Sequence, residues 1–137
     1  MGMTERAGGC LCGAIRYRIK SDPLATAVCH CTHCQKQSGG VFSTNLVVPE
    51  AQYEQTGETK VYADRGDSGQ AVLRHFCGDC GSPILSKAGI MPGMALVKAG
   101  TLDDMSGITP AVEVYTDHAA AWVAPVTGAQ RFAQGSS

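Results

Sequence analysis

The sequence has few aromatic side chains and no long apolar segment. Phe, Trp and Tyr make up 6% of the 137 residues, so the core has few large apolar anchors. A chain of this length folds as one domain and buries roughly two thirds of the surface of its unfolded state. A domain with so few aromatic residues gains stability from an added cross-link. We expect one domain over residues 5–133 and a small, polar, disordered tail at 134–137.

Charge and hydropathy exclude several classes of protein. No stretch approaches the roughly 20 apolar residues of a membrane-spanning helix, and residues 1–9 contain no apolar run that suits a signal peptide. We therefore expect a cytoplasmic protein with no membrane partner. The formal net charge is −1, and Arg16, Arg18 and Lys20 alternate along one face of an expected strand. This pattern is typical of a solvated face, so we expect no nucleic-acid partner.

Short apolar segments between turn residues predict a mainly β fold with minor helix. Residues 14–20 alternate apolar and basic side chains, which is the period-two pattern of a half-buried strand. The best helix candidate is 32–39, which Gly39 and Gly40 end, and a single helical turn is expected to begin at Pro49. Further short strands are expected at 42–48, 59–65, 71–77, 83–87, 94–100 and 112–116, with a turn at 66–69.

Four of the seven cysteines form two pairs. Cys10 and Cys12 lie in GGCLCG, and Cys77 and Cys80 lie in FCGDCGS. In a cytosolic protein such spacings indicate metal or redox chemistry before disulfides. The glycine after each pair permits a tight turn that aims both sulfurs at one point. Together the pairs supply the four thiolates of a closed, structural zinc site that joins distant parts of the chain.

The other three cysteines, Cys29, Cys31 and Cys34, lie in VCHCTHCQKQSGG. Three protein ligands with an open position are the usual pattern of a catalytic zinc, and soft thiolates favour zinc over magnesium or calcium. Such an ion is suited to hold the sulfur of a small thiol substrate as a thiolate. On spacing alone, a second structural site closed by His30, His33 or a distant residue is equally compatible. A thioredoxin-like redox pair at Cys31 and Cys34 is disfavoured because the βαβ context is missing.

The histidines and the late aromatic residues allow further expectations. His30 lies between two cysteines, where it suits a hydrogen-bond donor beside the metal ligands or a proton relay. An ordinary packed histidine is the alternative at this position. His33 is expected to be exposed on the short helix, and His75 to be packed in its strand. Trp122 and Phe132 are expected to anchor the core.

Three segments, GGCLCGAIRY, CHCTHCQKQSG and RHFCGDCGSPI, together resemble the glutathione-dependent formaldehyde-activating enzyme family, which includes centromere protein V. The late segment PAVEVYTDHAAAW is similar to the C-terminal strand and tryptophan of that family. Three cysteine motifs in the right order are far more specific than a lone C-x-x-C. The resemblance implies a zinc-stabilised, β-tent-like domain with two zinc ions per chain. Cys10, Cys12, Cys77 and Cys80 match the structural zinc ligands of the family, and Cys29, Cys31 and Cys34 match its second zinc site.

The resemblance also implies a reaction. This is the condensation of glutathione with formaldehyde to S-hydroxymethylglutathione, which is classed by its reverse as a carbon–sulfur lyase reaction. On this hypothesis Cys29, Cys31, Cys34 and His30 are the catalytic residues, and the partner is a small thiol such as glutathione. The alternative is a non-catalytic, zinc-stabilised binding or scaffold module. The fourth ligand of the three-cysteine site distinguishes the two hypotheses, because a protein side chain in that position closes the site.

Overall fold

The computed structural model describes residues 5–135. The fold is mainly β, as the sequence predicts, with one short α-helix, α1 (Thr32–Ser38), and three single 3-10 turns. The strands are β1 (Arg6–Gly9), β2 (Arg16–Ile19), β3 (Ala25–Cys29), β4 (Ser43–Pro49), β5 (Tyr53–Thr56), β6 (Lys60–Arg65), β7 (Ala71–Phe76), β8 (Pro83–Ala88), β9 (Met94–Lys98), β10 (Val112–Val114) and β11 (Gln130–Arg131). The 3-10 turns are η1 (Glu50–Gln52), η2 (Ala99–Thr101) and η3 (Thr116–His118).

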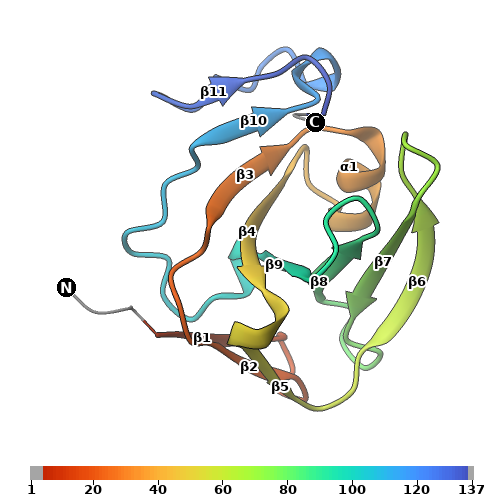
Figure 1. Cartoon of the computed structure of the whole chain (residues 1–137), viewed down its shortest axis with the longest axis vertical. Coiled ribbons are helices and arrows are strands. Elements are labelled where there is room, and N and C mark those ends of the chain that lie inside the picture. The colour runs from red at the N-terminus through yellow and green to blue at the C-terminus, as the bar shows by residue number, and fades with distance from the viewer. Residues whose placement is uncertain (1–4, 136–137) are drawn as a thin grey trace.

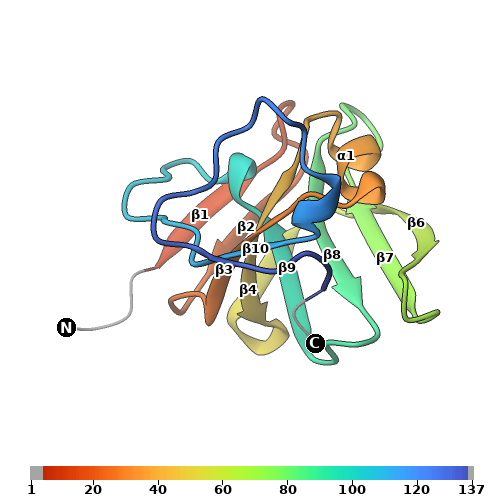
Figure 2. The ribbon, with the colours of Figure 1, turned by 90° about the horizontal axis from the view of Figure 1, so that it is seen from above.

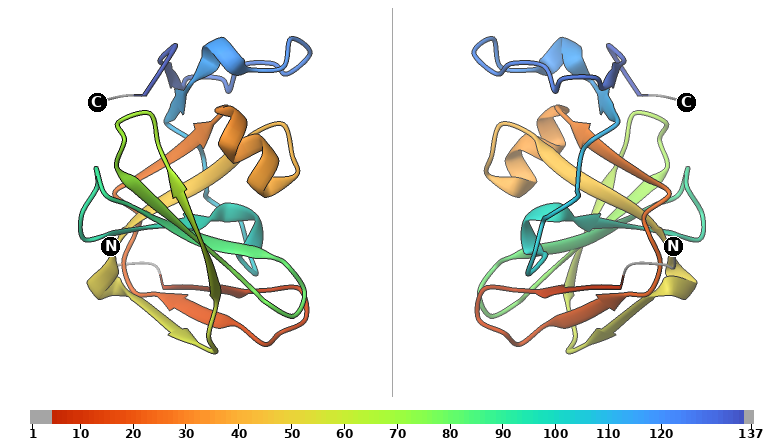
Figure 3. Two further views of the ribbon diagram at one scale, coloured as in Figure 1. Left: turned by 90° about the vertical axis from the view of Figure 1, so that its right-hand side faces the viewer. Right: turned by 90° about the vertical axis from the view of Figure 1, so that its left-hand side faces the viewer.

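The strands form a small sheet and a large sheet. The small sheet has the order β1-β2-β5, and the large sheet has the order β11-β10-β3-β4-β9-β8-β7-β6. The large sheet is antiparallel from β3 to β6, whereas β10 runs parallel to both of its neighbours, β3 and β11. Figures 1 and 3 show the small sheet at one end of the molecule and the C-terminal segment after β10 at the other.

Each of the seven expected strands is present, and so are the helix and the helical turn after Pro49. The turn at 66–69 is confirmed by the hydrogen bond from the Gly66 amide to the Gln70 carbonyl. Gly39 ends α1 in the left-handed conformation, with φ of 72°. Strands β1, β3, β5 and β11 were not expected. Their segments are short or rich in small and polar residues, so they show no clear alternation.

The apolar core lies between the small sheet and one face of the large sheet. The largest fully buried side chains there are Tyr17, Ile15 and Ile19, Leu46 and Val48, Ile84 and Leu85, and Val97. Tyr17 stacks on Tyr53 with ring centroids 5.4 Å apart, and it forms a 2.6 Å hydrogen bond with Thr101. Both rings belong to the small sheet, and the hydrogen bond of Tyr17 with Thr101 connects that sheet to η2, which follows β9 of the large sheet.

The expectation that Trp122 anchors the core is wrong. Its side chain is 77% exposed, and Phe132 is only half-buried. The cause is the position of the C-terminal segment, which extends the edge of the large sheet away from the core (Figure 3). The expected disordered tail is only partly described. Ser136 and Ser137 lie outside the described residues, and the Gln134 carbonyl accepts a hydrogen bond from the Tyr115 amide.

The opposite face of the large sheet is polar although it is buried. Cys29 pairs with Ser43, and Asn45 pairs with Lys98, so these four side chains share one face. Arg74, on β7, pairs with Ser86 of β8, and Ser86 pairs with Leu96 of β9. Leu96 is two residues from Lys98, so Arg74 lies on the same face as Lys98. Helix α1 follows directly after β3 at the end of this face, as Figure 2 shows from above. Within residues 5–135, no helix has the length and apolar composition to span a membrane.

Strand β1 approaches β2 and η2 so closely at Gly8 that a larger side chain should destabilise the fold. A Cβ atom at Gly8 would lie less than 3.0 Å from the Thr101 carbonyl oxygen and the Tyr17 side chain, whereas a Cβ atom at Gly100 would meet nothing within 4 Å. We expect Gly8→Ala to lower the free energy of unfolding by about 1–3 kcal/mol, because overpacked cores shift backbone and rotamers. Gly100→Ala is the control and should change it by less than about 0.5 kcal/mol. Urea unfolding of both variants checks this, and equal midpoints would contradict it.

Candidate metal centres

The first centre consists of Cys10, Cys12, Cys77 and Cys80. Cys10 and Cys12 lie in the connection between β1 and β2, and Cys77 and Cys80 lie between β7 and β8. Their four sulfurs all lie within 4.8 Å of one another, with Cys12 Sγ 3.6 Å from Cys10 Sγ and 3.8 Å from Cys77 Sγ. Tetrahedral zinc with Zn–S bonds of about 2.3 Å places sulfurs about 3.8 Å apart. The donor set and its spacing therefore fit zinc.

Hydrogen bonds reach three of these four sulfurs, and at Cys80 they favour the ionised thiolate that a metal requires. The Ile15 amide donates to Cys10 Sγ at 3.2 Å, and the Asp79 amide donates to Cys77 Sγ at 3.4 Å. The Ser82 hydroxyl, 3.2 Å from Cys80 Sγ, and nearby backbone amides lower the pKa of the Cys80 thiol to about 5. The turns that deliver these amides depend on left-handed glycines, such as Gly81 with φ of 83°.

The second centre consists of Cys29, Cys31 and Cys34. Cys29 ends β3, Cys31 is the N-cap of α1, and Cys34 lies in its first turn. The three sulfurs lie within 4.8 Å of one another, and the Cys34 amide donates to Cys31 Sγ at 3.2 Å. Cys29 and Cys34 are buried, whereas Cys31 is half-buried. The elements that carry the two centres lie toward opposite ends of the molecule in Figure 1.

The described residues supply no fourth His, Asp, Glu or Cys donor within the same 4.8 Å limit of this second cluster. Both neighbouring histidines have other partners. His30 Nε2 lies 2.8 Å from Glu113 Oε1, and His33 Nδ1 lies 2.8 Å from Asp64 Oδ2. His33 is exposed, as expected, and His30 is 1% exposed. The three thiolates alone therefore suit a soft ion such as zinc with room for another ligand.

Two buried cations, Lys98 and Arg74, lie beside the second centre and were missed by the sequence analysis. Lys98 Nζ donates to Ser43 Oγ at 3.0 Å and to Asn45 Oδ1 at 2.9 Å. Arg74 Nε donates to Asp64 Oδ2 at 2.8 Å. The pKa of the Cys34 thiol is lowered, first by hydrogen bonds from the Cys29 and Cys31 thiols and then by the charges of Lys98 and Arg74. Both cations thus favour negative charge on the cysteine sulfurs.

The strand pattern contained a signal for these cations. Lys98 and Arg74 each lie within a mostly apolar strand segment, ALVKA and VLRHF respectively. Buried lysine and arginine are rare unless they are paired. Their burial could not be inferred from one sequence, because each strand also has exposed positions.

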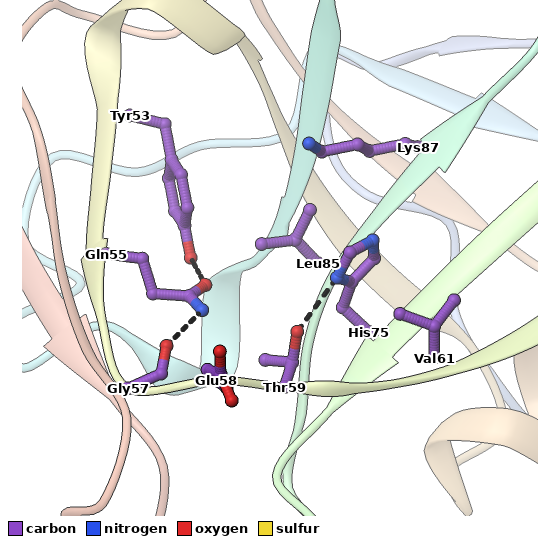
Figure 4. Close-up of a pocket in the computed structure, with 9 residues that line it drawn as sticks. All are labelled: Tyr53, Gln55, Gly57, Glu58, Thr59, Val61, His75, Leu85 and Lys87. Carbon is purple, nitrogen blue, oxygen red and sulfur yellow. Dashed lines mark hydrogen bonds between the residues drawn. The ribbon is translucent and has the colours of Figure 1, made fainter.

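A separate cleft of about 590 Å³ lies on the other face of the large sheet (Figure 4). Its lining includes Tyr53 and Gln55 from β5, His75 from β7, and Leu85 and Lys87 from β8. Adjacent residues of a strand point to opposite faces, so His75 lies on the side of β7 opposite Arg74. His75 Nδ1 lies 2.9 Å from Thr59 Oγ1. No cysteine lines this cleft, so it is distinct from both metal centres.

The fold and the two donor sets define a mainly β protein with two cysteine-built centres that suit zinc. Residues 5–118 match the profile of the family described as glutathione-dependent formaldehyde-activating enzyme. The chain belongs to this family, which confirms the resemblance of the three cysteine motifs.

A solved crystal structure of a Rhodobacter sphaeroides protein has a similar fold. The TM-score is 0.57 at 17% sequence identity, and the similarity covers 76% of this chain and 91% of that chain. At this identity the likeness concerns the fold alone. No curated protein matches the sequence closely enough to report.

The buried ion pair of Arg74 and Asp64 should contribute to the stability of the fold. Arg74 is 6% exposed, so Asp64→Ala leaves a buried guanidinium without its carboxylate. We expect this to lower the free energy of unfolding by about 3 kcal/mol. Glu54→Ala is the matched control, because Glu54 pairs with Arg18 and Lys20 at a half-exposed position, where a pair contributes about 0–1 kcal/mol. Denaturant unfolding of zinc-loaded protein measures both values, and equal losses would contradict the assignment.

Proposed function

We propose that the protein is a zinc-dependent carbon–sulfur lyase of the glutathione-dependent formaldehyde-activating type. It binds a small thiol such as glutathione at Cys29, Cys31 and Cys34, and it joins the thiol to formaldehyde or a related aldehyde. The observation that carries this proposal is the cluster of three cysteine sulfurs without a fourth donor among the described residues. We further propose that residues 5–133 act as one domain in the cytoplasm, where thiols are kept reduced.

Two zinc ions per chain have different roles in this proposal. Cys10, Cys12, Cys77 and Cys80 hold a structural ion that ties the small sheet to the β7–β8 connection. Cys29, Cys31 and Cys34 hold the second ion, and when bound it supplies a positive charge that keeps a small thiol in its nucleophilic thiolate form.

The reaction forms one carbon–sulfur bond. The sulfur of the thiol adds to the carbonyl carbon, the carbonyl π electrons move to oxygen, and the proton lost from sulfur ends on that oxygen. Nothing is oxidised or reduced. Lys98 and Arg74 stabilise the negative charge at the centre, since both favour the ionised form of Cys34. We assign the proton transfer to His30, whose buried Nδ1 has no hydrogen-bond partner in the protein.

Substitution of one cysteine from each centre separates the two roles. Cys80→Ser should be poorly folded, because a structural zinc contributes on the order of 10 kcal/mol of apparent binding energy, and typical domains have stabilities of about 5–15 kcal/mol. Cys34→Ser should remain soluble with one zinc ion, because its metal closes only a short loop. Zinc counting by mass spectrometry under reducing conditions and thermal unfolding check both expectations.

The wild-type protein in the same experiment should hold about two zinc ions and no disulfide. If Cys34→Ser unfolds as readily as Cys80→Ser, the three-cysteine centre is structural and the catalytic assignment fails. Folded wild-type protein that lacks zinc after gentle purification would overturn both roles.

Addition of a thiol should change the second centre only. With glutathione, X-ray absorption at the zinc edge should show a rise in average sulfur coordination, since the second ion gains one sulfur ligand. Cys34→Ser is the control and should show no rise. If a saturating panel of small thiols, glutathione included, leaves the wild-type spectrum unchanged, the protein is instead a zinc-stabilised binding or scaffold module.

A further inference from the structure

Lys98 is a buried cation whose hydrogen-bond partners are neutral. Its side chain is 6% exposed, and Nζ donates to Ser43 Oγ at 3.0 Å and to Asn45 Oδ1 at 2.9 Å. The Ser43 hydroxyl in turn donates to Asn45 Oδ1 at 3.4 Å. Among residues 5–135, no carboxylate forms an ion pair with Lys98. Because buried charges are paired or lie beside metal centres, this ammonium group requires a source of negative charge nearby.

The other buried cation of this face, Arg74, differs in that respect. Its Nε lies 2.8 Å from Asp64 Oδ2, and both side chains are largely buried. The carboxylate of Asp64 therefore balances the charge of the guanidinium. Of the two buried cations beside the second centre, Lys98 is the one whose charge is not balanced by a carboxylate.

The cysteine cluster of the second centre lies next to this ammonium group. Ser43, which accepts from Lys98, stands directly opposite Cys29 in the pairing of β3 with β4, and such opposite residues have Cβ atoms about 4.5–5.5 Å apart. Burial lowers the pKa of Lys98, while the charges of Cys34, Cys29 and Cys31 act in the opposite direction. The three cysteine sulfurs are thus the negative groups that Lys98 faces.

The charge of a metal-loaded centre depends on its additional ligand. Three thiolates and one divalent ion together carry a single negative charge. A neutral ligand leaves that charge unchanged, whereas a thiolate adds a second negative charge. A fixed cation beside the cluster stabilises the more negative of the two complexes, because opposite charges attract more strongly in a buried site than in water.

We propose that Lys98 is a specificity-determining residue, whose buried charge makes the three-cysteine centre prefer an anionic additional ligand over a neutral one. The proposal deepens the proposed function and rests on it for the identity of the natural ligand. The substrates of this centre are then thiols that bind through an ionised sulfur, and neutral nitrogen ligands are disfavoured. Preference between two ligands is a difference of affinities, so it can be measured without any catalytic turnover.

Cobalt-substituted protein provides the measurement, because the visible absorption of cobalt changes when its ligands change. Three probes are titrated separately: glutathione, azide as a simple anion, and imidazole as a neutral ligand. We expect Lys98→Gln to weaken the binding of azide and glutathione at least about tenfold and that of imidazole less than about threefold, since the lost charge acts on charged ligands. Glutamine keeps a group that can donate to Ser43 and Asn45. A merely structural role of Lys98 would weaken all three ligands alike.

Three further variants serve as controls. Lys87→Gln removes a cation from β8 that is 40% exposed and pairs with Glu50, so it should leave all three affinities unchanged. Cys34→Ser should show no spectral response at the second centre. Lys98→Arg keeps the charge, and its preference for azide over imidazole should stay within about threefold of the wild type.

Equal losses for azide and imidazole in Lys98→Gln, or no loss for either, would overturn the proposal. If Lys98→Gln fails to fold, Lys98→Arg decides, because a lost preference for azide in that variant contradicts a role of the charge. Binding of azide but not of glutathione, with the expected effect of Lys98→Gln, leaves this inference standing and overturns the proposed function. Binding of glutathione with an unchanged preference in Lys98→Gln does the reverse. A wild type that responds to none of the three probes has a closed centre, which overturns both.

Discussion

The convergence of four cysteine sulfurs between the two sheets is the contact on which the rest of the structure depends. Cys10 and Cys12 come from the β1–β2 connection, and Cys77 and Cys80 from the β7–β8 connection. The small sheet has three short strands and reaches the large one mainly through Tyr17 and its neighbours. The four sulfurs lie within 4.8 Å of one another, so the connections that carry them hold the two sheets together at this point. The scarcity of aromatic residues makes this link more important than it is in a larger core.

Alternation along the strands separates two functions within one sheet. The face toward the small sheet carries Leu46, Leu85 and Val97 and contributes stability. The other face carries Cys29, Lys98 and Arg74, so the two buried cations lie on the same face of the sheet as a cysteine of the second centre. A shift of one residue in the register of β9 would place Lys98 in the apolar core. The register of the sheet therefore determines the electrostatics of the centre.

The sequence predicted the elements with regular patterns and the grouping of the seven cysteines into two clusters. Residues 14–20 alternate clearly and contain the strand β2; Cys29, Cys31 and Cys34 lie close in sequence and also in space. Partners across the fold were not predictable. Glu113 is 83 residues from His30, and nothing near Glu113 in the sequence indicates that β10 lies beside β3. Trp122 failed as a core anchor for the same reason, because its exposure depends on where the last segment docks.

The parallel pairing of β3 with β10 has a consequence for the order in which the protein is assembled. Parallel neighbours that are distant in sequence pair late, because a long loop must close before any contact forms. A ribosome releases the three cysteines of the second centre early and the segment after β10 last. The three cysteines of this cluster are therefore present in the growing chain before Glu113, Val126 and Arg131. The unfinished chain passes through a stage in which the three thiols are present while His30 still lacks its hydrogen-bond partner Glu113.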